Sequence, residues 1–329
     1  MPLRCMADMP IWNSVMEKKI LKIFPFFEPR MWGGKRMLEN FNYQSDIYPV
    51  GEVYNVVALK NHADCLVKDT CMTLSDLYIT YPEWFKCDTN ELPIRVNILD
   101  PEADLSIQLH PDDAFARSYN GGRGKPEAWV ILDAPEDGYI AFGHTAKTRD
   151  EFEQKVGNKE FDSLIKYIDV VVDDYIDIPC GTIHAIGKDV LTYNISRNAD
   201  CTLRVYDYDR LDPATGKTRD LQVEEVIKNV NIPDKSKGFV HYPEIEQDGC
   251  LVTSYWDEPG LYTLKRIRVK EHGYHQHQRF AFYTIVEGEA KINDVVVRKG
   301  ETIFVPDQFG LLEITGDVDM FMASYENSK

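Results

Sequence analysis

The stretch LSIQLHPDD, residues 105–113, combines an apolar strand pattern with a row of polar side chains. Successive side chains of a β-strand point to opposite faces, so Ser106, Gln108 and His110 share one face. The leucine and isoleucine residues between them form the other face and can enter a core. The pattern stops at Pro111. The stretch therefore predicts a strand whose polar face needs either a functional partner or solvent.

The length and composition are those of an ordinary globular protein. The chain has 329 residues, enough for two domains or one large domain with insertions, and it is 43% hydrophobic and 28% charged. Its net charge of −17 argues against nucleic acid or an anionic membrane as the main partner, because both require a basic surface. An acidic surface mainly favours solubility.

The cysteine content indicates a reducing compartment. Seven cysteines occur without a CxxC pair, and the first twenty residues lack the uninterrupted apolar core of a secretion signal. No stretch is long and apolar enough to cross a membrane. We therefore expect a cytoplasmic protein with reduced thiols.

Three segments show helical patterns. Residues 73–86 have apolar side chains at helical spacing after a capping residue, Thr73 or Ser75. Residues 148–168 form a second helical pattern, which Gly157 and its neighbour divide into two short helices. Residues 222–230 predict a third short helix.

The rest of the chain predicts short strands in two halves. From residue 249 onward, apolar runs alternate with turn signals, including a hairpin at Asn293-Asp294. Many short strands of this kind are typical of antiparallel sandwiches or barrels. We predict a mainly β protein of two jelly-roll barrels with a small helical insertion.

A second motif supplies a partner for the opening stretch. In IPCGTIHAIG, residues 178–187, a strand is followed by Pro-x-Gly-x-x-His ending at His184, and this spacing resembles the second half of a cupin metal signature. Together with Gln108, His110 and Glu127, this histidine would form a mixed nitrogen and oxygen site inside one barrel. Such a site suits Zn²⁺ and tolerates other first-row divalent ions. Taken singly, each histidine can instead be a hydrogen-bonded structural group.

Four motifs carry a wider resemblance. LSIQLHPDD, GKPEAW, IPCGTIHAIG and RVYDYDR occur in the order seen in type I phosphomannose isomerases, the zinc-dependent cupin enzymes. The chain resembles their shorter bacterial branch from MWGG onward, and more weakly in its C-terminal half. The resemblance implies interconversion of mannose 6-phosphate and fructose 6-phosphate by proton transfer between C1 and C2. It implies a catalytic cupin barrel over residues 1–240 and a second cupin-like barrel over 241–329.

The resemblance also assigns roles to individual residues. It implies one zinc ion held by Gln108, His110, Glu127 and His184. Arg204 and Lys125 would be catalytic, and the substrate-binding residues would be Ser106, Glu52, Asn97 and Asn194. An enediolate intermediate needs fixed positive charge and a group that moves the carbon-bound proton, which fits the two cations. The alternative is that Lys125 and Arg204 form ordinary ion pairs with Asp207, Asp209 or Glu127.

The chain departs from the family pattern at positions near the expected site. Asn97 stands where a lysine is usual, and Asn194 where a glutamate is common; Tyr54 and Val57 replace a tryptophan and a serine. The two asparagines remove one charge of each sign. Either the enzyme acts on a different sugar or sugar phosphate, or a relative without that activity keeps the metal for structure or for binding sugar.

The C-terminal half contains a further His-x-His, formed by His275 and His277. No glutamate follows at the usual spacing, and no later histidine completes the signature. We predict that this barrel has no metal and serves as packing and cavity wall. The expected partner is a small sugar or sugar phosphate, and the expected state is a monomer or weak homo-oligomer.

Overall fold

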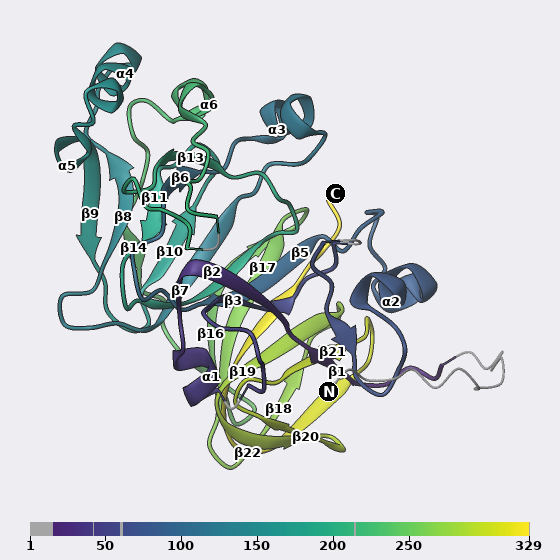
Figure 1. Cartoon of the computed structure of the whole chain (residues 1–329). Coiled ribbons are helices and arrows are strands. Elements are labelled where there is room, and N and C mark those ends of the chain that lie inside the picture. The colour runs from purple at the N-terminus through teal and green to yellow at the C-terminus, as the bar shows by residue number, and fades with distance from the viewer. Residues whose placement is uncertain (1–15, 42, 60–61, 214, 329) are drawn as a thin grey trace.

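The computed structural model describes residues 16–41, 43–59, 62–213 and 215–328, whose strands form three antiparallel sheets (Figure 1). Strand accounts for 43% of the structure and helix for 14%, which confirms the predicted mainly β class. Within the described ranges, none of the sheets is found to close into a barrel.

The first sheet has ten strands, most of which come from the C-terminal part of the chain. Its strands are β1 (Leu21–Phe24), β4 (Leu66–Val67), β15 (Ile245–Gln247), β16 (Cys250–Glu258), β17 (Tyr262–Val269), β18 (His272–Gln276), β19 (Ala281–Ile292), β20 (Val295–Arg298), β21 (Thr302–Val305) and β22 (Leu311–Ser324). The β19–β20 hairpin turns at Asn293, whose φ of 50° is the left-handed conformation that such a turn needs. The hairpin predicted at this position is confirmed.

The other two sheets belong to the N-terminal part. The seven-stranded sheet runs β14 (Phe239–Val240), β10 (Tyr175–Ile178), β7 (Glu127–Asp133), β12 (Leu191–Arg197), β5 (Ile94–Leu99), β3 (Val50–Val56) and β2 (Phe26–Gly34). The five-stranded sheet runs β13 (Leu203–Tyr206), β6 (Ile107–Leu109), β11 (His184–Ile186), β8 (Tyr139–His144) and β9 (Ile165–Asp169).

The seven-stranded sheet is the middle layer, because its two faces belong to different cores. One face supplies side chains such as Val96, Ile98 and Tyr193 to a core shared with the ten-stranded sheet, where Tyr193 stacks on Phe321 with ring centroids 4.3 Å apart. The opposite face joins a second core with the five-stranded sheet. Strand alternation thus aims every second residue of β5, β7 and β12 toward the five-stranded sheet.

Strands β1 and β4 belong to the N-terminal part of the chain but lie in the ten-stranded sheet. Leu21 to Ile23 of β1 pair with Thr302 to Phe304 of β21, so residues near the N-terminus extend the sheet that residues 245–324 build. The predicted division at residue 240 stays a prediction. Because β1 also pairs with β4, the described N-terminal segment packs with both parts.

The helices lie mainly at the end of the molecule that carries the five-stranded sheet (Figure 1). They are α1 (Arg36–Asn40), α2 (Leu74–Thr80), α3 (Asp113–Asn120), α4 (Arg149–Gly157), α5 (Phe161–Leu164) and α6 (Val223–Asn229), with a 3₁₀ turn at Pro82–Trp84. The predicted helical segments are confirmed at α2, α4 with α5, and α6, and Thr73 is the cap of α2. No helix of the described ranges is long and apolar enough to span a membrane.

The second helical prediction is wrong at its end. Residues 165–168 form part of strand β9, in which exposure alternates along the chain and which pairs with β8. Pairing with a neighbouring strand overrides the local helical spacing there. Gly33 and Gly34 are the last two residues of β2. A Cβ atom at Gly33 would lie 2.4 Å from the backbone nitrogen of Gly51, so glycine allows β2 and β3 to approach closely.

Candidate active site

A cavity of about 310 Å³ lies between the seven-stranded and the five-stranded sheets. The sequence-predicted site residues that line it are Glu52, Asn97, Ser106, Gln108, Lys125, Glu127, Asn194 and Arg204. His110 and His184 lie beside it, against Glu127. The structure therefore brings these ten side chains together from segments that are far apart along the chain.

The five-stranded sheet contributes one row of side chains through its register. His184 of β11 is directly opposite Gln108 of β6, and Gln108 is directly opposite Arg204 of β13. Directly opposed residues of antiparallel strands point to the same face. His184, Gln108 and Arg204 therefore form one line, with the glutamine between the imidazole and the guanidinium.

The seven-stranded sheet contributes two parallel rows. Asn194 of β12 is opposite Asn97 of β5 and Trp129 of β7. Two residues further along, Ser196 of β12 is opposite Arg95 of β5 and Glu127 of β7. Asn97 and Asn194, the two departures from the family pattern, are thus cross-strand neighbours on the polar face of this sheet.

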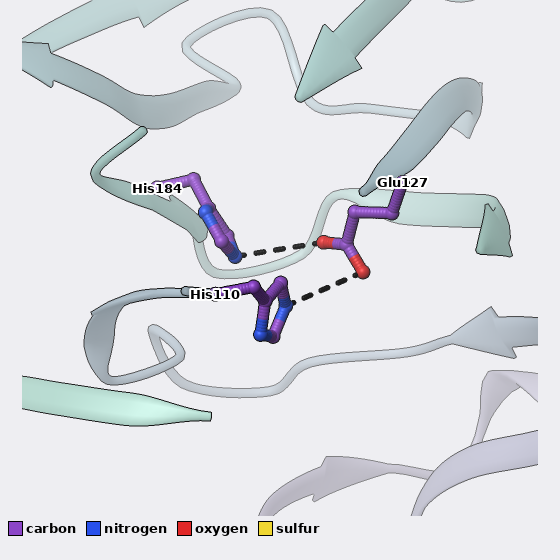
Figure 2. A group of neighbouring side chains, drawn as sticks. All are labelled: His110, Glu127 and His184. Carbon is purple, nitrogen blue, oxygen red and sulfur yellow. Dashed lines mark ion pairs between the residues drawn. The ribbon is translucent and has the colours of Figure 1, made fainter. Parts of the chain in front are cut away.

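Three buried side chains converge where the two sheets meet (Figure 2). His110 Nε2 lies 3.5 Å from Glu127 Oε2, and His184 Nε2 lies 3.5 Å from Glu127 Oε1. The two imidazole centroids are 4.9 Å apart. All three ligand atoms lie within 4.8 Å of one another, so the side chains could share one ion.

The outer nitrogens of both imidazoles face backbone carbonyl groups. His110 Nδ1 is 2.9 Å from the carbonyl oxygen of Cys201, and His184 Nδ1 is 2.9 Å from that of Thr182. A carbonyl oxygen only accepts, so each Nδ1–H donates and each neutral ring turns the lone pair of Nε2 toward Glu127. Hydrogen bonds of this kind fix the tautomer and orientation of histidines that bind metals.

Burial keeps the imidazoles neutral and the carboxylate ionised. Burial lowers the pKa of His184 to about 4, and it also lowers the pKa of His110, with Lys125 acting in the same direction. Burial alone would raise the pKa of Glu127. The Lys125 ammonium, followed by His110, instead holds that pKa well below its usual range.

This arrangement fits a divalent cation. His184 Nε2 is buried without a hydrogen-bond partner, and it directs its lone pair at a carboxylate oxygen that can only accept. A cation between them satisfies both atoms. Metal–ligand bonds of the usual length at tetrahedral angles separate ligand atoms by roughly 3.4 Å. The two imidazole–carboxylate separations, both 3.5 Å, are close to this value. Gln108 Oε1 accepts a hydrogen bond from Ser106 Oγ at 3.2 Å, and its assignment as a fourth ligand stays a prediction.

The ion-pair alternative holds for Lys125 but not for Arg204. Lys125 Nζ is 2.8 Å from Glu127 Oε2 and 3.5 Å from His110 Nε2, so the lysine touches two members of the cluster. Asp207 pairs with Arg210 and Arg219, and Asp209 pairs with Lys159.

Arg204 has no carboxylate partner among the described residues. Its Nε is buried without a hydrogen-bond partner. Burial, with Arg219 nearby, lowers the pKa of Arg204. Its guanidinium is therefore available to an anion in the cavity.

Glu52 organises the side of the cavity next to Asn97. Glu52 Oε1 accepts from Arg30 Nε at 2.7 Å, and Oε2 accepts from Asn97 Nδ2 at 2.9 Å. Burial alone would raise the pKa of Glu52, but Arg30 lowers it below its usual value. The Oδ1 atoms of Asn97 and Asn194 are buried without partners. Each offers an acceptor to a ligand hydroxyl group.

Several cavity residues were not predicted from the sequence. They are Arg30, Trp32, Arg95, Trp129 and Arg219. Arg95 had a detectable signal, because it lies two residues before Asn97 in PIRVNILD and so shares its strand face. Arg30 and Arg219 had no such signal. The position of Arg30 depends on which strands become neighbours, and that of Arg219 depends on the path of the loop before α6.

The C-terminal histidines do not form a comparable group. Within the described residues, three or more metal-ligating side chains meet only at His110, Glu127 and His184. His277 Nε2 is 3.0 Å from Ser324 Oγ, and the ring of His275 packs edge-on against Tyr283. The prediction that this half has no metal stays a prediction.

Comparisons with known proteins relate the whole chain to one group of enzymes. No family model matches the chain. The mannose-6-phosphate isomerase ManA of Bacillus subtilis is 31% identical over 302 residues, covering 89% of this chain and 94% of that protein. The mannose-6-phosphate isomerase of Streptococcus mutans is 29% identical over 332 residues, covering 98% and 99%.

Solved structures agree with these relatives. The crystal structure of mannose 6-phosphate isomerase from Bacillus subtilis superposes with a TM-score of 0.87 at 25% identity, covering 93% of this chain and 99% of that one. A zinc-bound holo form of a mannose 6-phosphate isomerase superposes with a TM-score of 0.74 at 13% identity, covering 93% and 99%, and shows a shared fold.

Proposed function

Because the chain belongs to the mannose-6-phosphate isomerase family, we propose that its cavity interconverts mannose 6-phosphate, or a closely related sugar phosphate, and the corresponding ketose. The observation that carries the proposal is the buried His110, Glu127 and His184 group at the end of a polar cavity. The enzyme is an isomerase, and the family membership does not favour a sugar-binding protein without activity.

We propose zinc as the metal, held by His110, Glu127, His184 and Gln108. The two imidazoles, the carboxylate and the amide oxygen form a donor set that suits Zn²⁺, and a relative of the same fold has been solved with zinc. When bound, the ion supplies a Lewis acid next to the substrate oxygens.

The side chains of the cavity divide the remaining work. Arg204 places a guanidinium where negative charge develops on the sugar oxygens of an enediolate. Lys125 is the proposed group that moves the proton between C1 and C2, because it lines the cavity and touches both His110 and Glu127. Asn97 and Asn194 are amides and do not titrate, so they cannot take that role.

The same amides are suited to binding. Asn97 and Asn194 present acceptor atoms without partners, and Ser106 presents a hydroxyl group on the opposite sheet. We propose that these three residues and Glu52 hold the hydroxyl groups of the sugar. The cytoplasmic location and the monomeric or weakly associated state remain predictions.

The test is a coupled assay of metal-loaded protein with a panel of aldose phosphates and free aldoses. The proposal expects turnover of mannose 6-phosphate or a related aldose phosphate, loss of that turnover with a chelator, and its return with zinc. A protein that binds sugar, shown by thermal stabilisation, but turns over no member of the panel would contradict the proposal.

A further inference from the structure

Arg95 is a buried arginine that the proposed chemistry does not use. It lies in β5, two residues before Asn97, and lines the cavity although only 4% of its surface is exposed. Its row on the seven-stranded sheet continues through Ser196 to Glu127. The side chain therefore belongs to the wall that carries the carboxylate of the metal-ligand group.

Its guanidinium has no acidic partner among the described residues. Arg95 Nε donates to Asn198 Oδ1 at 3.3 Å, and the guanidinium lies 5.5 Å from the ring centroid of Tyr54. One terminal nitrogen is buried without any hydrogen-bond partner. Two other cavity arginines differ, because Arg30 pairs with Glu52 and Arg219 pairs with Asp207.

The carboxylates of the cavity do not fill this gap. Glu52 is bound by Arg30 and Asn97, and Glu127 faces Lys125 and the imidazoles. Asp200, at the cavity, is exposed to solvent. Leaving a buried cation unpaired is costly, so such a group indicates that an anion occupies the site in the working protein.

The register separates Arg95 from the metal-ligand group. Arg95 and Glu127 lie on strands with one strand between them, so their backbones are about 10 Å apart. An extended sugar can bridge such a gap, with its reacting carbons near Glu127 and its far end near Arg95. The arrangement leaves Arg204, on the opposite sheet, for the charge that develops at the reacting carbons.

We propose that Arg95 binds the phosphate group of the substrate and thereby selects phosphorylated over free sugars. The assignment rests on the proposed function, because it takes its ligand from the isomerase substrate. A guanidinium matches a phosphate through parallel hydrogen bonds, which a lysine cannot reproduce. It adds a specificity-determining residue that the sequence motifs do not contain.

The experiment uses metal-loaded protein and its Arg95→Met variant. Calorimetry measures binding of inorganic phosphate, and steady-state kinetics measures KM and kcat for mannose 6-phosphate. We expect the affinity for phosphate to fall roughly 10- to 100-fold, as for loss of a charged hydrogen bond, and KM to rise more than kcat falls. Arg95→Lys should recover only part of the affinity. Metal content should not change.

The matched control is Arg197→Met. Arg197 follows Ser196 on β12 and points to the other side of the strand. It pairs with Asp113 at 2.7 Å and donates to the Gly124 carbonyl oxygen at 3.2 Å, so this change removes the same charge from a nearby side chain that does not line the cavity. Phosphate affinity should be retained there. Thermal unfolding gives a second readout: phosphate should stabilise the wild type but not Arg95→Met, whose midpoint without phosphate should equal or exceed that of the wild type.

The outcomes separate this inference from the proposed function. Phosphate affinity within about twofold of the wild type in Arg95→Met would overturn the inference, even if the wild type is an active isomerase. A variant that unfolds early and loses metal would show that Arg95 acts structurally, and this result would also overturn it. Phosphate binding that depends on Arg95 in a protein without turnover would support it while the isomerase proposal fails.

Discussion

Two histidine motifs in this molecule have similar sequences and different surroundings. At the N-terminal cavity, His110 meets His184 and Glu127, which arrive from other strands. The Nε2 atoms of His184 and His275 are both buried without a hydrogen-bond partner, so this feature alone does not distinguish the two regions. In the ten-stranded sheet, His277 contacts Ser324 and His275 packs on Tyr283. The imidazoles are buried in the first region and half-buried in the second, and among the described residues only the first region places a carboxylate 3.5 Å from them.

The two histidine motifs differ in the side chains that neighbouring strands place next to them. Gln108 faces His184 directly across β6 and β11, and β7 brings Glu127 to the same end of the cavity. A His-x-His motif supplies two ligands at most, so a metal site depends on the third ligand that the fold delivers. The predictions below test that contrast, beginning with the largest expected effect.

Replacing a proposed metal ligand should have the largest effect on metal affinity and activity. His184→Ala should lower zinc affinity and activity by more than about 100-fold, because removing a direct ligand costs at least as much as losing a residue that orients one. Metal analysis of the purified protein and the coupled assay measure both. His275→Ala, in the other region, is the matched control and should keep metal and activity. Loss of metal in the control but not in His184→Ala would reverse the contrast.

Replacing Arg204 should have the second-largest effect on activity. Arg204→Met should lower kcat/KM by about 100-fold, because the variant removes a cation placed at developing negative charge. Zinc content should stay at the wild-type level, since Arg204 is not among the ligand atoms that meet. Arg298→Met, an exposed arginine of the ten-stranded sheet paired with Glu289, serves as the control. Unchanged kcat/KM in Arg204→Met would remove it from the catalytic group.

Substitutions of Asn97 and Asn194 should have coupled effects on stability. Asn97→Lys with Asn194→Glu should raise activity on mannose 6-phosphate by about tenfold if the substrate preference has drifted. Asn194→Glu alone buries a new carboxylate and should destabilise the fold, and Asn97→Lys opposite it should restore about 1–3 kcal/mol. Denaturant unfolding of the two single variants and the double variant gives this coupling energy. Additive stabilities and unchanged activity would show that our interpretation of these two positions is wrong.

Acid should leave the ligand set intact and act on the stability of the fold, so it has the smallest effect on the contrast between the two regions. Burial lowers the pKa values of His184, His275 and His277 to about 4 in the protein without metal. Between the ordinary histidine pKa near 6.5 and this value, the unfolded chain binds protons that the folded chain does not. Stability should therefore fall as the pH falls from about 6.5 to 4.

Thermal unfolding of chelated protein across this range measures the effect. Replacing His275 and His277 together by glutamine should flatten the pH dependence without changing zinc affinity. An equally steep dependence in that variant would show that these two imidazoles do not contribute.

Much of the fold and the site could be predicted from local patterns. Strand alternation placed Ser106, Gln108 and His110 on one face, and the spacing that ends at His184 identified its partner. Local patterns fail where pairing between distant residues decides the structure. Helical spacing predicts a helix through residue 168, but the helix ends at Leu164 because strand pairing with β8 determines residues 165–168. The pairing of β1 with β21 joins residues about 280 positions apart, which no local pattern encodes.

The site shows the same division. Asn97 and Asn194 were identified singly by their departure from a family pattern, but only the register reveals that they face each other. Arg204 could not be separated from an ordinary ion pair, because the partners of Asp207 and Asp209 depend on loop conformation. Arg95 lies in the strand sequence PIRVNILD beside Asn97, and its burial and its lack of a carboxylate partner become visible only in three dimensions.

A crystal structure of zinc-loaded protein, with anomalous data collected at the zinc edge, tests the account most directly. We predict one strong peak between His110 Nε2, His184 Nε2 and Glu127, at about 2.0–2.1 Å from each nitrogen. A map with no peak there, or with its only peak at His275 and His277, would contradict it.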